Sequence, residues 1–265
     1  MKVGIITASL PMDTKAALRK AKELGAHGVQ LWIVDNDLDP RNLTRSGREE
    51  LITHMASLGL ERSALCGDIG GFTDPVTVDE RIARTKQMFD LCVDLRTPIL
   101  TTHVGVVPDD PLSREYTGLL GVVREIAEYA ANRGCCFATE TGPESAEVLA
   151  DFLTRVNSGG ARANYDPANL VMCGFNHLDG LYALRGFIVH THAKDGIARA
   201  IVENKEVQEV PLGKGDVDFP RYLHILREEL GYSGYLTIER KCGADPVADI
   251  AEAIAFLKRQ PGVAK

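Results

Sequence analysis

The residues best suited to chemistry gather in the segment Phe187-Ile-Val-His-Thr-His-Ala-Lys-Asp195, which begins apolar and then places His190, His192, Lys194 and Asp195 within six residues. Three other apolar segments also end in an acidic residue, namely Glu140, Asp166 and Glu239. A strand that is apolar at its start and polar at its carboxyl end is typical of a site at the rim of a parallel sheet. Imidazole and carboxylate groups at such a rim can bind a divalent metal or transfer protons.

The candidate metal ligands are Glu140, Asp166, His192 and Glu239. A set of three carboxylates and one imidazole consists mostly of oxygen, which suits Mn²⁺, Mg²⁺ or Co²⁺ better than a structural zinc site. A single acid at the end of a strand is often a helix cap or one half of an ion pair. Four such residues at equivalent positions of successive strands favour a site for one divalent ion: Mn²⁺, Co²⁺ or Mg²⁺, with Zn²⁺ as the alternative.

The pattern of apolar residues predicts eight strands that alternate with eight helices. The predicted strands cover residues 3–7, 28–33, 60–66, 98–103, 135–140, 162–166, 187–192 and 234–239. The predicted helices lie near residues 14–24, 48–58, 79–94, 114–133, 145–156, 178–184, 220–230 and 247–257. Strict alternation in a chain of 265 residues indicates an α/β protein, a single (β/α)8 TIM barrel that spans residues 1–265 as one domain.

An open doubly wound sheet is the alternative architecture. The first strand lacks a GxGxxG motif, and the polar residues follow several strands instead of lining one crevice, which disfavours this alternative. The longest irregular stretch, Gly196–Asp216, is expected to be a functional loop.

Composition excludes several classes of partner. The formal net charge of −7 and the absence of a Lys/Arg-rich run argue against nucleic acid. The apolar run at the N-terminus is too short for a secretory signal, and no stretch is long enough for a membrane span. The six scattered cysteines are expected to be reduced thiols of a cytoplasmic protein. The oligomeric state is left open, with a homo-oligomer among the alternatives.

Five motifs of the chain resemble the xylose-isomerase-like TIM barrel family of sugar and sugar-phosphate isomerases and epimerases. They are Glu140-Thr-Gly-Pro143, Tyr165-Asp-Pro-Ala-Asn-Leu170, His190-Thr-His-Ala-Lys-Asp195, Gly213-Lys-Gly-Asp-Val-Asp-Phe219 and Thr237-Ile-Glu239. The resemblance covers the second half of the chain in order, whereas the first half fits mainly by its barrel rhythm and by His103. It implies that the four candidate ligands hold one divalent ion, and that Glu140 and Glu239 act as acid and base on opposite faces of the sugar.

The expected activity is isomerisation or epimerisation of a small sugar, sugar phosphate or keto-polyol, by proton transfer through a metal-bound enediolate. A dehydratase of a keto-inositol or similar hydroxy-ketone would use the same metal and base, and is the first alternative. A catalytically inactive sugar-binding barrel is an alternative of another class, and the intact pair Glu140 and Glu239 argues against it. The multi-zinc endonucleases of the family carry further histidines at the end of the third strand and in the loop after the seventh strand. In this chain these places hold Cys66-Gly67 and residues 196–216, which contain no histidine, and this argues against an endonuclease.

Four residues are expected to bind the substrate: His103, Asn169, Lys194 and Trp32. His103 ends a strand beside a glycine and would face the pocket, although a buried, satisfied imidazole is an equal alternative. Asn169 stands where ketose epimerases of the family usually carry His. Lys194 could bind a phosphate, but an ion pair with Asp195 is preferred.

Three further residues or segments carry weaker expectations. Trp32 ends the second strand, so it could form a wall of the substrate site or belong to the core. His190 should lie one layer below His192 as a packed or supporting group. The glycines of Gly213-Lys-Gly-Asp216 could bind a phosphate through backbone N–H groups, and this segment is expected to close over the pocket.

Overall fold

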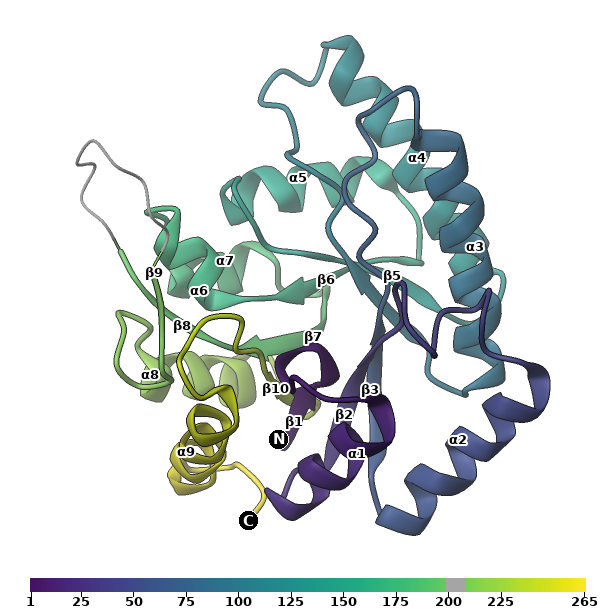
Figure 1. Cartoon of the computed structure of the whole chain (residues 1–265). Helices are drawn as coiled ribbons and strands as arrows, with labels where there is room; N and C mark the ends of the chain where they lie inside the picture. The colour runs from purple at the N-terminus through teal and green to yellow at the C-terminus, as the bar shows by residue number, and fades with distance from the viewer. Residues whose placement is uncertain (199–207) are drawn as a thin grey trace.

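The computed structural model describes residues 1–198 and 208–265, and it forms a closed barrel of eight parallel strands with the helices outside (Figure 1). The barrel strands are β1 (Lys2–Ile6), β2 (Gly28–Trp32), β3 (Glu61–Cys66), β4 (Ile99–Thr102), β5 (Cys136–Glu140), β6 (Ala161–Tyr165), β7 (Ile188–Ala193) and β10 (Tyr235–Ile238). They follow one another around the barrel in chain order, and β10 pairs with β1 to close it. The predicted (β/α)8 barrel is therefore confirmed.

The helices cover the outside of the barrel in chain order. They are α1 (Thr14–Glu23), α2 (Arg45–Leu58), α3 (Val78–Asp94), α4 (Arg114–Ala131), α5 (Ala146–Val156), α6 (Pro167–Met172), α7 (His177–Ala183), α8 (Phe219–His224) and α9 (Pro246–Arg259). A 3-10 turn η1 (Thr7–Ser9) follows β1, and a π-helical turn η2 (Ile225–Glu229) continues α8. The predicted alternation differs in one unit, because two short helices, α6 and α7, follow β6.

Most helices begin at a polar side chain that accepts a backbone N–H from the first turn, the usual arrangement at a helix N-terminus. Asp13 caps α1, Ser113 caps α4, Ser145 caps α5 and Asp245 caps α9 in this way. Their apolar faces pack on the strands, as in α5, where Leu149, Phe152, Leu153 and Val156 are buried. This packing fixes each strand end relative to its neighbours and so positions the side chains at the barrel rim.

The stretch after β7, predicted to be an irregular loop, contains two strands that pair antiparallel, β8 (Asp195–Ile197) and β9 (Gln208–Val210). Residues 199–207 of this stretch lie outside the described residues. The carboxylate of Asp195 accepts hydrogen bonds from the backbone N–H groups of Gly196, Gly213 and Gly215 at 2.9 Å. The two glycine N–H groups of the Gly-Lys-Gly motif are therefore engaged by a carboxylate and not open to a phosphate.

Among the described residues, no helix is both long enough and apolar enough to cross a bilayer. The end of the chain returns to its beginning, because the Ala264 N–H donates to the carbonyl of Met1 at 2.9 Å.

Candidate active site

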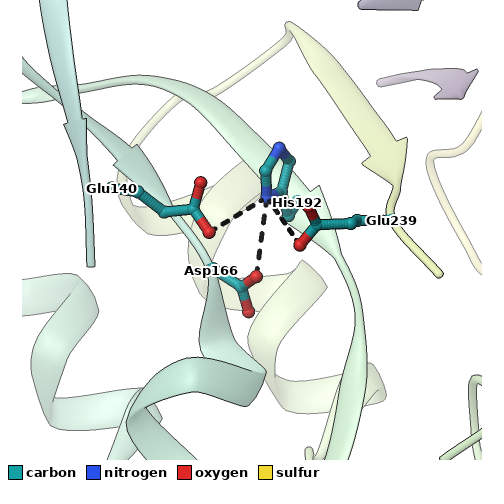
Figure 2. Close-up of side chains that lie close together, drawn as sticks. All are labelled: Glu140, Asp166, His192 and Glu239. Carbon is teal, nitrogen blue, oxygen red and sulfur yellow. Dashed lines mark ion pairs between the residues drawn. The ribbon is translucent and has the colours of Figure 1, made fainter. Parts of the chain in front are cut away.

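Four side chains converge at the carboxyl end of the barrel (Figure 2). Glu140 ends β5, and Asp166, His192 and Glu239 belong to or directly follow β6, β7 and β10. One ligand atom from each lies within 4.8 Å of the others, and all four residues are buried. Nδ1 of His192 faces the three carboxylates, at 3.5 Å from Glu140 Oε1, 3.5 Å from Asp166 Oδ2 and 3.7 Å from Glu239 Oε2. The structure thus brings all four predicted ligands together.

The donor atoms of this cluster suit a divalent ion. Nδ1 of His192 and Oδ2 of Asp166 are buried and have no hydrogen-bond partner. Buried polar atoms normally have one, so two that face each other across 3.5 Å call for a group between them. Three carboxylate oxygens and one imidazole nitrogen form a set that Mn²⁺, Co²⁺ or Mg²⁺ would accept, and Zn²⁺ also binds such groups.

The two carboxylate oxygens of Asp166 have different roles. Oδ1 caps α6 by accepting the backbone N–H groups of Ala168 at 2.9 Å and Asn169 at 3.1 Å. Oδ2 makes no hydrogen bond and faces His192. The helix-cap interpretation and the metal-ligand interpretation therefore apply to different atoms of the same side chain.

Gln30 orients the imidazole of His192. Its Oε1 lies 2.9 Å from Nε2 of His192, and its own amide donates to the hydroxyl of Thr101 at 2.6 Å. With Nε2 carrying a proton toward Gln30, Nδ1 of the neutral ring presents its lone pair to the cluster. Burial disfavours the charged ring, but the carboxylates of Glu140 and Glu239 outweigh burial and raise the pKa of His192 to about 10. An ion that binds Nδ1 must therefore displace a proton.

His190 lies one layer deeper in the barrel, as expected. Its Nδ1 is 2.8 Å from Oδ1 of Asn164, and its Nε2 is 2.9 Å from the hydroxyl of Thr237. The amide of Asn164 donates in turn to Oε2 of Glu140 at 3.1 Å. His190 thus holds the side chain that orients Glu140, and its two ring nitrogens are both engaged.

Lys194 contacts the cluster, and its preferred pairing with Asp195 is wrong. Its Nζ donates to Oε2 of Glu239 at 2.9 Å and lies 3.5 Å from Oδ2 of Asp166. Successive side chains of a strand alternate in direction, so Lys194 points to the same side as His192 while Asp195 points away. Burial disfavours the ammonium, but Asp166 and Glu239 outweigh burial and raise the pKa of Lys194.

A second lysine, Lys241, reaches the cluster and was not among the predicted residues. Its Nζ lies 3.1 Å from Oε1 of Glu239. Burial of Glu239 favours its neutral form, but Lys194, His192 and Lys241 prevail and lower the pKa of this carboxyl. The sequence held a signal for Lys241, since a residue two positions after Glu239 has the same facing in an extended segment.

His103 lies beside the cluster next to a carboxylate that sequence reasoning missed. Its Nδ1 is 2.9 Å from Oδ2 of Asp68, and its Nε2 is 3.6 Å from Oε1 of Glu140. Burial opposes protonation, but Glu140 and Asp68 prevail and raise the pKa of His103 to about 9. An imidazolium next to a candidate metal ligand is well placed to donate a proton, and its contact with the substrate stays a prediction.

The other two predicted substrate-binding residues differ in their positions. The amide of Asn169 donates to Oε1 of Glu140 at 2.9 Å, and its oxygen accepts from Lys194 at 3.2 Å. Asn169 thus lies within the site. Trp32 ends β2, is partly buried, and donates its indole N–H to the carbonyl of Val34 at 3.0 Å. Its role as a wall of the substrate site stays a prediction.

Comparison with known proteins gives a consistent family assignment. The profile of the xylose isomerase-like TIM barrel family matches residues 18–260. A xylose isomerase domain protein from Planctomyces limnophilus is 28% identical, with 97% of this chain and 95% of that chain covered and a TM-score of 0.84.

Two more distant structures share the fold. The probable 3-DHS dehydratase AsbF from Bacillus anthracis is 19% identical, with 98% of this chain and 99% of that chain covered and a TM-score of 0.78. A D-psicose 3-epimerase whose structure was determined in the presence of D-fructose is 15% identical, with 99% of this chain and 100% of that chain covered and a TM-score of 0.76. No curated protein sequence matches this chain.

Proposed function

Because this chain belongs to the xylose isomerase-like TIM barrel family, we propose that it is a divalent-metal-dependent isomerase or epimerase of a small sugar, sugar phosphate or keto-polyol. The observation that carries the proposal is the buried cluster in which His192 Nδ1 and Asp166 Oδ2 face each other without hydrogen-bond partners. Two buried donor atoms without hydrogen-bond partners can bind a cation between them. The carboxylates of Glu140 and Glu239 lie beside these atoms and can transfer protons.

Glu140, Asp166, His192 and Glu239 would hold the ion, which when bound supplies Lewis acidity at the substrate carbonyl and so acidifies the adjacent C–H. β5 and β10 flank β6 and β7 in the barrel, so Glu140 and Glu239 approach the cluster from its two sides. One carboxylate accepts the proton from the carbon next to the carbonyl, and the C–H electron pair forms the enediolate. The other face of that carbon, or the neighbouring carbon, then receives a proton from the second carboxyl.

The surroundings of the two carboxylates differ. Lys194 and Lys241 contact the two oxygens of Glu239 and keep it ionised. Glu140 accepts hydrogen bonds from the amides of Asn164 at 3.1 Å and Asn169 at 2.9 Å, and His103 and His192 lie 3.6 Å and 3.5 Å from its Oε1. These contacts fix both side chains in position before a substrate arrives.

The test is Glu239→Gln, which keeps the shape and one possible oxygen ligand but removes the base. The variant should keep most of its metal and lose turnover by about 10² to 10⁴-fold, the usual contribution of one general base. With a converted ketose or keto-inositol in D₂O, the wild type should place deuterium next to the carbonyl and the variant should do so far more slowly. Glu144→Gln is the matched control, since Glu144 is a buried glutamate outside the cluster.

Three results would overturn this mechanism. Conversion without any gain of solvent deuterium would favour direct hydride transfer. An unchanged rate in Glu239→Gln would remove Glu239 from the chemistry, and failure of the wild type to convert any of the screened ketones would favour the inactive sugar-binding barrel.

A dehydratase is the second candidate, and the position of His103 favours it. Loss of a hydroxyl β to the carbonyl needs the same base and an acid that protonates the departing oxygen. His103 is placed to supply such a proton, since its Nδ1 pairs with Asp68 at 2.9 Å, and Glu140 and Asp68 raise its pKa to about 9 against the opposing effect of burial. Release of one water per turnover, seen by the mass of the product, distinguishes this reaction from isomerisation.

A further inference from the structure

The cations around Glu239 indicate the charge of the substrate. We propose that the substrate carries an anionic group, a carboxylate or a phosphate, that pairs with Lys241 at the mouth of the barrel. This inference rests on the proposed function, because it assumes that the cluster holds a divalent ion.

Two ammonium groups contact one carboxylate in this site. Lys194 lies 2.9 Å from Oε2 of Glu239, and Lys241 lies 3.1 Å from Oε1. Oε2 is also the oxygen that faces His192 at 3.7 Å. A carboxylate that coordinates a cation has less negative charge to offer its ammonium neighbours, so ion binding leaves both lysines short of a counter-charge.

Of the two lysines that contact Glu239, Lys241 is the one that solvent and a ligand can reach. Its side chain is 55% exposed, whereas that of Lys194 is only 5% exposed and is engaged by two carboxylates. The neighbouring Arg240 is not available, because its guanidinium pairs with Glu209 and Asp249 at 2.7 Å. An anion that enters the barrel mouth would therefore meet the ammonium of Lys241.

The anion would be recognised by side-chain charge and not by a backbone phosphate loop. The N–H groups of Gly213 and Gly215, the glycines of the nearby Gly-Lys-Gly motif, already donate to Asp195 at 2.9 Å. A carboxylate and a phosphate remain the two sources of the same chemistry, since either can accept from an ammonium. The size of the group that binds best distinguishes them.

The experiment measures metal affinity without turnover. Mn²⁺ is titrated into metal-free protein by calorimetry, in chloride alone and with acetate, sulfate or glycerol added as carboxylate, tetrahedral oxyanion and neutral probes. Anion and metal binding are reciprocal, so at least one anion should tighten Mn²⁺ binding by about fivefold or more, and glycerol should not. The coupling should disappear in Lys241→Met and persist in Lys15→Met, the control that removes an exposed lysine of α1 outside the cluster.

The outcomes separate the two proposals. Mn²⁺ binding that neither anion changes, or that changes equally in Lys241→Met, overturns the anionic substrate and leaves the metal-dependent function standing. Absence of Mn²⁺ binding before any anion is added overturns the proposed function, and the anionic substrate with it. A larger effect of acetate identifies a carboxylate substrate, and a larger effect of sulfate identifies a phosphate.

Discussion

Replacing Gln30 tests whether His192 is a metal ligand held in one orientation. Gln30 Oε1 lies 2.9 Å from Nε2 of His192, so Gln30→Leu removes the acceptor that fixes the ring while nearly keeping the volume of the side chain. Loss of such a supporting hydrogen bond typically weakens metal binding by about 10- to 100-fold. That range corresponds to roughly 1.4 to 2.7 kcal/mol of binding free energy.

The same substitution also affects the metal-free fold. It leaves the Nε2–H of His192 buried without its acceptor, which should lower the free energy of unfolding by about 1 to 3 kcal/mol. Both quantities are measured on the same preparation, metal affinity by calorimetry and stability by urea denaturation. The change in affinity is read only from samples shown to be folded by circular dichroism.

Thr102→Val is the matched control for this prediction. Thr102 is buried on β4 next to Thr101, the residue that accepts from Gln30, but its hydroxyl lies 3.5 Å from the carbonyl of Gly67 and outside the path from Gln30 to His192. It should keep wild-type metal affinity. An unchanged affinity in Gln30→Leu, with a folded protein, would refute the view that Nδ1 of His192 is presented to an ion through Gln30.

Two further predictions concern the ligands and pH. Asp166→Asn keeps the Oδ1 atom that caps α6 but replaces the free Oδ2, so the variant should lose metal and activity while remaining folded. His192→Ala should also lose metal and activity. A full equivalent of metal by elemental analysis in either variant would argue against the assignment of that residue as a ligand. Glu140 and Asp68 raise the pKa of His103 from 6.5 to about 9 against the effect of burial, so its contribution to the stability of the metal-free protein is present below pH 6.5 and lost as the pH rises through 9. Urea denaturation from pH 6 to pH 10 should therefore show the stability difference between wild type and His103→Gln shrinking as the pH rises, and a constant difference would contradict the paired imidazolium.

The sequence alone determined the barrel and its four principal site residues. Eight apolar strands that alternate with helices predict a parallel sheet, and eight such units in a chain of this length favour a closed (β/α)8 barrel. Glu140, Asp166, His192 and Glu239 could be found because each ends or follows an apolar strand, and the carboxyl ends of barrel strands meet at one rim. Strand periodicity also predicted correctly that His190 would lie one layer below His192.

Only the tertiary structure decided which groups surround these residues. Gln30 and Asp68 lie far from the cluster in sequence, and their contacts with His192 and His103 exist because barrel closure brings β2, β3, β4 and β7 around one axis. Lys194 was assigned to its neighbour Asp195, but the fold turned Asp195 outward to hold the glycine loop and turned Lys194 inward to Glu239. The predicted pairing of Lys194 with Asp195 failed because successive side chains of a strand point in opposite directions. The buried ammonium of Lys194 lies where carboxylates compensate its charge.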